Sequence, residues 1–142
     1  MATDLIAKAS VDIAATEDEV WKALIDPAAI KEYMFGSTVT SEWREGSPIT
    51  WAGEFEGKKY EDKGVITEFE PGKRLGFTHF SPRSGVPDVP ENYHHVIIEL
   101  TGEGDATHVA LEQDNNADED SRDHSAKNWE MMLDGLKKYV ER

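Results

Sequence analysis

The sequence predicts an α+β fold in which a curved antiparallel sheet of about seven strands wraps around a long C-terminal helix, with two short helices after the first strand. Three observations lead to it. Short runs in which apolar and polar residues alternate, separated by turn residues, fill residues 38–115. Helix-start signals follow the first strand. Apolar residues at helical spacing form a stripe along the last segment. We expect residues 1–142 to form a single domain, because this length is near the usual size of one.

The first strand and the two helices after it are marked by local signals. Val11 and Ile13 alternate with less apolar neighbours, which is typical of a half-buried strand. Thr16 is followed three residues later by Glu19, the pairing of a capping box that begins a helix. Asp26-Pro27 supplies a second N-cap and a proline at the first helical position. The two helices therefore follow each other almost end to end.

Residues 38–115 are interpreted as an antiparallel meander with turns at sites such as Pro71-Gly72. Gly53 and Gly64 fall inside predicted strands, where glycine often marks a bulge or bend. The proline-containing stretch from Ser81 to Glu91 is either a lid over a pocket or a passive connector. The predicted strands run from Val39 to Trp43, Ile49 to Phe55, Tyr60 to Glu70, Leu75 to Phe80, Tyr93 to Thr101 and Thr107 to Asp114.

The last segment, from about Asp118, predicts a helix of roughly six turns. Acidic residues gather at its start and Lys137 and Lys138 at its end, so each sign complements the nearby end of the helix dipole. An isolated stripe of apolar side chains needs a partner surface, so this helix must dock on the sheet. Its apolar stripe consists of Ala126, Trp129, Met132, Leu133, Leu136 and Val140.

Composition excludes several classes of protein. The net charge of −14 would repel phosphate backbones, so we expect no nucleic-acid partner. The absence of cysteine excludes disulfides, thiolate nucleophiles and cysteine-based zinc sites. No apolar run approaches the roughly 18 residues of a membrane span, and the N-terminus lacks the pattern of a secretory signal. We therefore expect a cytoplasmic protein with no membrane insertion.

Four sequence segments narrow the prediction further. They are ATEDEVWKALIDP (residues 15–27), GVITEFEPGKRL (64–75), THVALEQD (107–114) and WEMMLDGLK (129–137). Together they extend over nearly the whole chain, which resembles the START-like (SRPBCC) superfamily and specifically the AHSA-like family, similar to the activator of heat-shock-chaperone ATPase. This resemblance implies a helix-grip fold. It also implies that the chain binds a hydrophobic ligand, acts on one, or regulates a chaperone, and the resemblance does not choose among these three roles.

A cavity in such a fold would lie between the concave face of the sheet and the last helix. Side chains that point inward from both elements are therefore the candidates, and strand parity and the helical stripe supply them. Ordinary core packing is the other interpretation for most of them. The candidate ligand-binding residues are Trp51, Phe55, Phe77, His79, His94, Val96, Ile98, Gln113, Trp129, Met132 and Leu133.

Polar groups suited to chemistry are few in this set. His79 and His94 could orient a ligand or titrate, and Asp62 shares the parity of Tyr60 and Ile66 and could turn inward. The favoured interpretation is a solvent-facing or otherwise satisfied histidine and a solvated Asp62. His94 and His95 are neighbours on a strand and point to opposite faces, so they cannot chelate a metal together. The sequence contains no nucleophile elbow, phosphate-binding loop or dinucleotide fingerprint. We assign no catalytic residue, metal or cofactor.

Three functions remain open from the sequence. The leading hypothesis is a non-catalytic or weakly catalytic carrier or sensor of a small hydrophobic molecule. The second is an interaction protein that regulates a chaperone or another ATPase. The third is a cyclase- or hydrolase-like enzyme that uses His79, His94 or Asp62 as acid or base.

Overall fold

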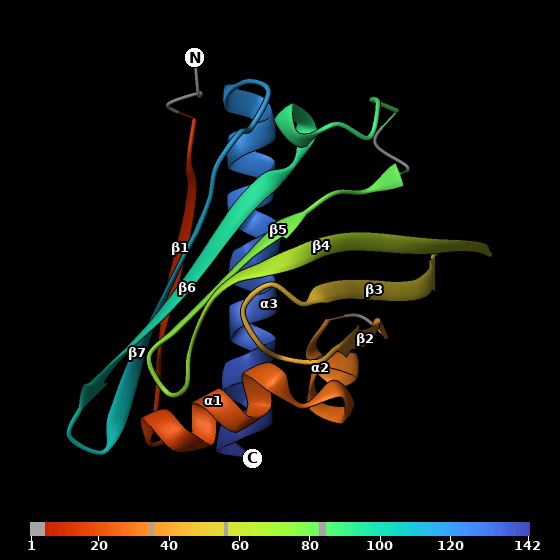
Figure 1. Cartoon of the computed structure of the whole chain (residues 1–142). Coiled ribbons are helices and arrows are strands. Elements are labelled where there is room, and N and C mark those ends of the chain that lie inside the picture. The colour runs from red at the N-terminus through yellow and green to blue at the C-terminus, as the bar shows by residue number, and fades with distance from the viewer. Residues whose placement is uncertain (1–4, 35, 56, 83–84) are drawn as a thin grey trace.

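The computed structural model describes residues 5–34, 36–55, 57–82 and 85–142, and its elements follow the predicted order (Figure 1). The predicted α+β helix-grip fold is confirmed, and most element boundaries lie within two residues of the prediction. The elements are β1 (Ala7–Ile13), α1 (Glu17–Ile25), α2 (Pro27–Tyr33), β2 (Thr38–Ser41), β3 (Pro48–Phe55), β4 (Lys58–Glu70), β5 (Arg74–His79), a 3₁₀ turn at Pro90–Asn92, β6 (His94–Glu103), β7 (Ala106–Gln113) and α3 (Glu119–Glu141).

All seven strands form one antiparallel sheet in the order β1-β7-β6-β5-β4-β3-β2. The β2–β5 part of the sheet is a meander, and β1 joins the far side by pairing with β7. The sheet curves around α3, while α1 and α2 lie near the end of α3 that carries the C-terminus (Figure 1). Helix α2 packs against both β2 and α3, so it lies at the β2 end of the sheet.

The two strand glycines have different roles from those predicted. The register shift in the β4–β5 pair falls between Ile66 and Glu68, not at Gly64. Gly64 instead permits a close approach between strands, because a Cβ atom there would lie 1.8 Å from the carbonyl oxygen of Thr78. Gly53 sits in regular pairing opposite Tyr60. The bends of the sheet are therefore not located by its glycines alone.

The predicted helix caps are present. Thr16 Oγ1 accepts from the N–H of Glu19 at 3.3 Å, and the Glu19 carboxylate accepts from the N–H of Thr16 at 3.3 Å, which completes the capping box. Asp26 accepts from the N–H of Ala28 at 3.0 Å at the start of α2. Asp118 caps α3 by accepting from the N–H of Ser121 at 2.7 Å. Hydrogen bonds from the backbone and side chain of Ser121 lower the pKa of the Asp118 carboxyl.

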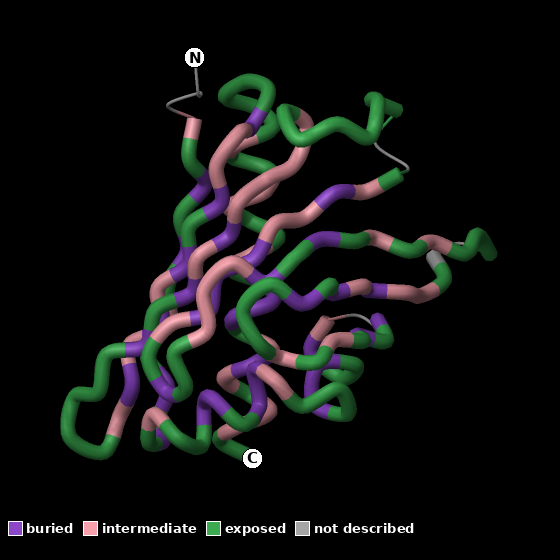
Figure 2. Tube along the Cα trace, in the orientation of Figure 1, coloured by how far each residue is buried: buried purple, intermediate pink, exposed green. Residues whose placement is uncertain are grey.

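The core lies between the inner face of the sheet and the helices (Figure 2). The stripe of α3 faces it as predicted, with Met132, Leu133 and Leu136 buried and Trp129 partly buried. Among the described helices, none is long and apolar enough to cross a membrane.

The segment before β6 is fastened to β4 by one carboxylate. Asp88 pairs with the Lys63 ammonium and accepts from the Tyr93 hydroxyl at 2.6 Å. Both bonds help to lower the pKa of the Asp88 carboxyl. Residues 83–84 of the predicted loop lie outside the described residues, so its role as a lid or a connector stays a prediction.

Candidate functional site

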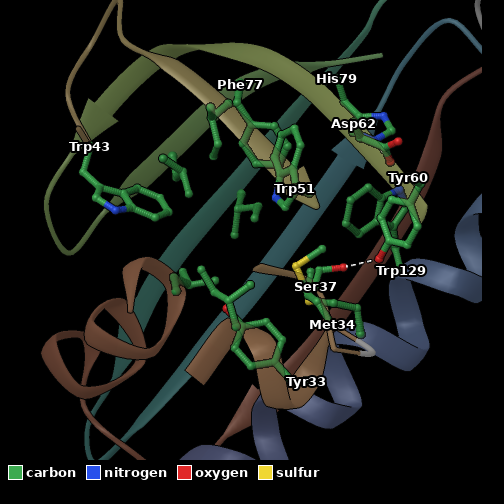
Figure 3. Close-up of a pocket in the computed structure, with 16 residues that line it drawn as sticks. Tyr33, Met34, Ser37, Trp43, Trp51, Tyr60, Asp62, Phe77, His79 and Trp129 are labelled. Carbon is green, nitrogen blue, oxygen red and sulfur yellow. Dashed lines mark hydrogen bonds and ion pairs between the residues drawn. The ribbon is translucent and has the colours of Figure 1, made fainter. Parts of the chain in front are cut away.

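A cavity of about 210 Å³ lies between the concave face of the sheet, α2 and the middle of α3 (Figure 3). Most of the side chains around it are aromatic or aliphatic, with a few polar groups. For scale, an engineered apolar cavity of roughly 150 Å³ in another protein holds benzene or xenon. The lining residues are Leu24, Ile30, Tyr33, Met34, Ser37, Trp43, Ile49, Trp51, Tyr60, Asp62, Leu75, Phe77, His79, Ile98, Trp129 and Met132.

Rings on β3 and β5 form one wall. The rings of Trp51 and Phe77 have centroids 5.3 Å apart and are tilted by 50°. The Trp51 ring also meets the His79 ring edge-on, at 5.2 Å. Contacts of this kind restrain the rings, since aromatic pairs prefer tilted or edge-to-face geometry at these separations. The wall therefore presents a rigid aromatic surface to anything in the cavity.

Helix α2 closes the opposite side with Tyr33. Its hydroxyl donates to the backbone oxygen of Ala23 at 2.9 Å, and burial raises the pKa of the phenol far above its ordinary value. Tyr33 therefore stays neutral, and its hydroxyl is occupied by the backbone of α1. It contributes apolar ring surface to the cavity and also fixes α2 against α1.

Polar groups occupy one side of the cavity. His79 Nε2 and Asp62 Oδ2 are 2.9 Å apart, and the two side chains are 27% and 20% exposed. The Tyr60 and Ser37 hydroxyls share a hydrogen bond of 2.6 Å (Figure 3). The Tyr60 ring can reach Ser37 because Gly53 lies beneath it, where a Cβ atom would be 2.6 Å from the Tyr60 hydroxyl oxygen.

A buried polar network fixes Trp129. The indole N–H of Trp129 donates to the side-chain oxygen of Gln113. Asn116 donates to the backbone oxygen of Gln113 at 3.1 Å and to that of Leu5 at 2.9 Å. Gln113 and Asn116 are only 6% and 1% exposed, so these bonds have little competition from water. The network ties the cavity face of α3 to the end of β7.

The structure brings together only part of the predicted site. Trp51, Phe77, His79, Ile98, Trp129 and Met132 line the cavity. Gln113 lies behind Trp129 as its hydrogen-bond partner, consistent with the expected proximity of the two. Val96 and Leu133 are fully buried in the core and do not line it, because strand parity and the helical stripe identify the buried face without locating the hollow along it.

The remaining two candidates are His94 and Phe55. His94 lines a separate, more polar hollow of about 500 Å³ beside the first turns of α3, and its Nδ1 donates to the backbone oxygen of Asp114 at 2.9 Å. His79 borders both hollows, and its ring stacks with that of His94 at 6.3 Å. The side chain of Phe55 lies outside the described part of the chain.

The prediction missed the side of the cavity formed by α1, α2 and the segments around β2. Nothing in the sequence reports how α2 docks on the sheet, so its residues could not be placed. Tyr60 could have been predicted as a cavity residue, since it lies two residues before Asp62 on β4 and faces the same side of the sheet. Strand parity also places Leu75 on the inward face with Phe77 and His79, and it allows Asp62 to turn inward. The cavity residues outside the predicted list are Leu24, Ile30, Tyr33, Met34, Ser37, Trp43, Ile49, Tyr60, Asp62 and Leu75.

The chemistry available in this cavity is apolar contact plus a small number of hydrogen bonds. Within the described residues, no three His, Asp or Glu side chains lie close enough together to hold a metal ion. The Asp62–His79 pair is the one arrangement in the lining that combines a carboxylate with an imidazole. Such a site can orient a small ligand at one end while its rings enclose the rest.

Comparisons with known proteins agree with the fold. A solved structure of ChR145 from Cytophaga hutchinsonii is 52% identical, with a TM-score of 0.86, and the match covers 99% of this chain and 97% of that one. CalU16 from Micromonospora echinospora is 24% identical with a TM-score of 0.72, covering 99% and 85%. The Aha1 dimer from Colwellia psychrerythraea is 18% identical with a TM-score of 0.73, covering 96% of each chain.

A search of curated proteins gives no match. The family model described as "Activator of Hsp90 ATPase homolog 1-like protein" matches residues 14–141, from the end of β1 through α3. The four segments that suggested the resemblance all fall within that match. The chain therefore belongs to the Activator of Hsp90 ATPase homolog 1-like family and has its SRPBCC-type helix-grip fold.

Proposed function

We propose that this chain binds a small hydrophobic molecule in the cavity between the sheet and α3, as a carrier or sensor. The supporting observation is a hollow of about 210 Å³ whose walls are mainly aromatic and aliphatic. The hollow is partly open to the surface, and its mainly apolar lining with a few polar groups is the composition typical of a ligand pocket. The walls also keep their shape through ring contacts and the Tyr33 and Trp129 hydrogen bonds.

The cavity sets the size and affinity of the ligand. A molecule of one or two fused rings matches the volume, by comparison with the cavity of roughly 150 Å³ that holds benzene. Burying roughly 200 Å² of ring surface contributes about 5 kcal/mol, which corresponds to a Kd on the order of 0.1 mM. Additional hydrogen bonds to the polar side would tighten binding below that value.

The four tryptophans provide a direct test. Trp43, Trp51 and Trp129 line the cavity, whereas Trp21 packs against Phe69 outside the lining. In a ¹H–¹⁵N spectrum, titration with one- and two-ring aromatic compounds should shift the indole N–H signals of the three cavity tryptophans. The signal of Trp21 should stay in place and serves as the internal control. Equal movement of all four signals, or of none, would contradict binding in this cavity.

A second candidate function is supported by the family match. The family description names activation of the Hsp90 ATPase, so an Hsp90-type chaperone is a partner to test. Adding the purified chain to such a chaperone should raise its rate of ATP hydrolysis if this candidate is right. If the rate of ATP hydrolysis stays unchanged over a range of chain concentrations while ligands shift the indole signals, the chaperone role is contradicted and the ligand-binding role stands.

A further inference from the structure

We propose that the cavity selects neutral aromatic alcohols or phenols over aromatic carboxylates, an inference that rests on the proposed function. It follows from which atoms of the polar side remain available to a ligand (Figure 3). A hydroxyl group can donate a hydrogen bond, whereas an ionised carboxylate can only accept. On the polar side of this cavity, Asp62 and His79 offer acceptors.

Asp62 supplies the first acceptor. It lies on β4 opposite Trp51, two residues after Tyr60, so both side chains point to the inner face of the sheet. Its Oδ2 is held by His79 at 2.9 Å. Its other oxygen, Oδ1, has no hydrogen-bond partner within the described part of the chain. That oxygen can accept from a ligand.

His79 supplies the second acceptor. Because a carboxylate can only accept, the short contact requires Nε2 of His79 to carry the hydrogen. A neutral imidazole that donates from Nε2 accepts at Nδ1. The orientation of the ring is restrained by its contacts with Trp51 and His94 and by the bond to Asp62.

Charge further disfavours an anionic ligand. No lysine or arginine is among the residues that line the cavity in the described chain. Lys63, the neighbour of Asp62, is turned to the other face of β4 and pairs with Asp88. A ligand carboxylate placed here would face Asp62 without a cationic partner, in a chain of net charge −14.

The hydroxyl pair adds the complementary group. Tyr60 and Ser37 each have one O–H, and only one of the two hydrogens is used in the bond between them. The second hydrogen is available to an acceptor atom. A ligand hydroxyl therefore suits this side of the cavity, since its hydrogen can go to Asp62 or His79 while its oxygen accepts.

The test compares three ligands of one shape on the unmodified chain: naphthalene, 2-naphthol and 2-naphthoate. At pH 7 the phenol is neutral and the carboxylate is ionised. Their dissociation constants, measured from the indole signals, should show 2-naphthol binding at least about tenfold more tightly than 2-naphthoate, the value of one hydrogen bond to a charged group. Naphthalene reports whether the cavity accepts an apolar ring at all.

The variant Asp62→Asn keeps the shape of the side chain and removes its charge. It should reduce the preference for 2-naphthol over 2-naphthoate by about tenfold, because an amide can donate to a carboxylate. Asp134→Asn is the matched control, since it makes the same change on an exposed residue of α3 outside the lining. This control should keep the preference of the unmodified chain.

The outcomes separate the two proposals. Binding of naphthalene together with equal binding of 2-naphthol and 2-naphthoate would overturn this inference and leave the proposed function standing. Failure of all three ligands to bind would overturn both. Because the ligand comparison uses the unmodified chain, it decides the question even when Asp62→Asn does not fold.

Discussion

Replacing Trp129 by Phe tests whether the buried network of Trp129, Gln113 and Asn116 holds α3 in place. Phe keeps a ring in the cavity wall but lacks the N–H that donates to Gln113. Gln113 is 6% exposed, so water cannot readily replace that donor. Leaving a buried acceptor without its partner costs about 1 to 3 kcal/mol of folding free energy. For a chain of this length, that loss lowers Tm by roughly 3 to 10 °C.

The assay is urea unfolding followed by far-ultraviolet circular dichroism, since the substitution itself alters tryptophan fluorescence. The midpoint should fall while the m-value stays constant, because the surface exposed on unfolding hardly changes. Gln113→Leu alone should also lose stability, as it leaves the Trp129 N–H unpaired.

The double variant carries the decisive comparison. When Trp129→Phe and Gln113→Leu are combined, neither member of the hydrogen bond remains to be left unpaired. The double variant should therefore lose clearly less stability than the sum of the two single losses, with a coupling energy of about 0.5 to 3 kcal/mol. Simple additivity of the two losses would refute the account of this bond.

Three further predictions concern the sheet, the helix end and the cavity. Gly64→Ala should cost more than about 4 kcal/mol in urea unfolding, because its Cβ would meet the Thr78 carbonyl oxygen at 1.8 Å, whereas Gly104→Ala, with φ of +72° and open space around it, should cost only about 1 kcal/mol. Equal costs would contradict the strand contact. Bonds from the Ala14 N–H and Lys137 lower the pKa of the Glu141 carboxyl, so its ionised form adds stability above the ordinary pKa of about 4.3, and this is lost as pH falls through the lower folded value. Glu141→Gln should therefore be less stable than the unmodified chain at pH 7 in chemical denaturation, and the difference in stability should shrink as the pH is lowered and the carboxyl becomes protonated; a difference of constant size would contradict the assignment. Ile98→Trp should fill part of the cavity and weaken naphthalene binding at least about tenfold in calorimetry while the fold is retained, and unchanged binding would place the ligand elsewhere.

Most of the fold could be predicted from the sequence because its signals are local. The capping box at Thr16 and Glu19 depends on residues three apart, and the strands of the meander depend on alternation over a few residues. The register shift between Ile66 and Glu68 was not predicted, because the extra residue on β4, Thr67, is not a glycine. The glycine beside the shift, Gly76, lies on the partner strand and pairs with Glu68.

The cavity was only partly predictable because its position depends on how distant elements dock. Strand and helix periodicity identifies buried side chains, and it correctly separates Met132 from exposed Met131 on α3. It does not distinguish a residue that borders a void from one that fills the core, as Val96 and Leu133 illustrate. Met34 and Ser37 reach the cavity only because α2 packs across the β2–β3 end of the sheet.

The most direct test of a ligand-binding hollow is a set of intermolecular nuclear Overhauser effects between bound 2-naphthol and the methionine methyl groups. Met34 and Met132 line the cavity, while Met131 lies next to Met132 in sequence and is 58% exposed. We expect contacts from the ligand ring to the methyl groups of Met34 and Met132 and none to that of Met131. Contacts to Met131 without contacts to the other two would show that the ligand binds on the surface and contradict the account.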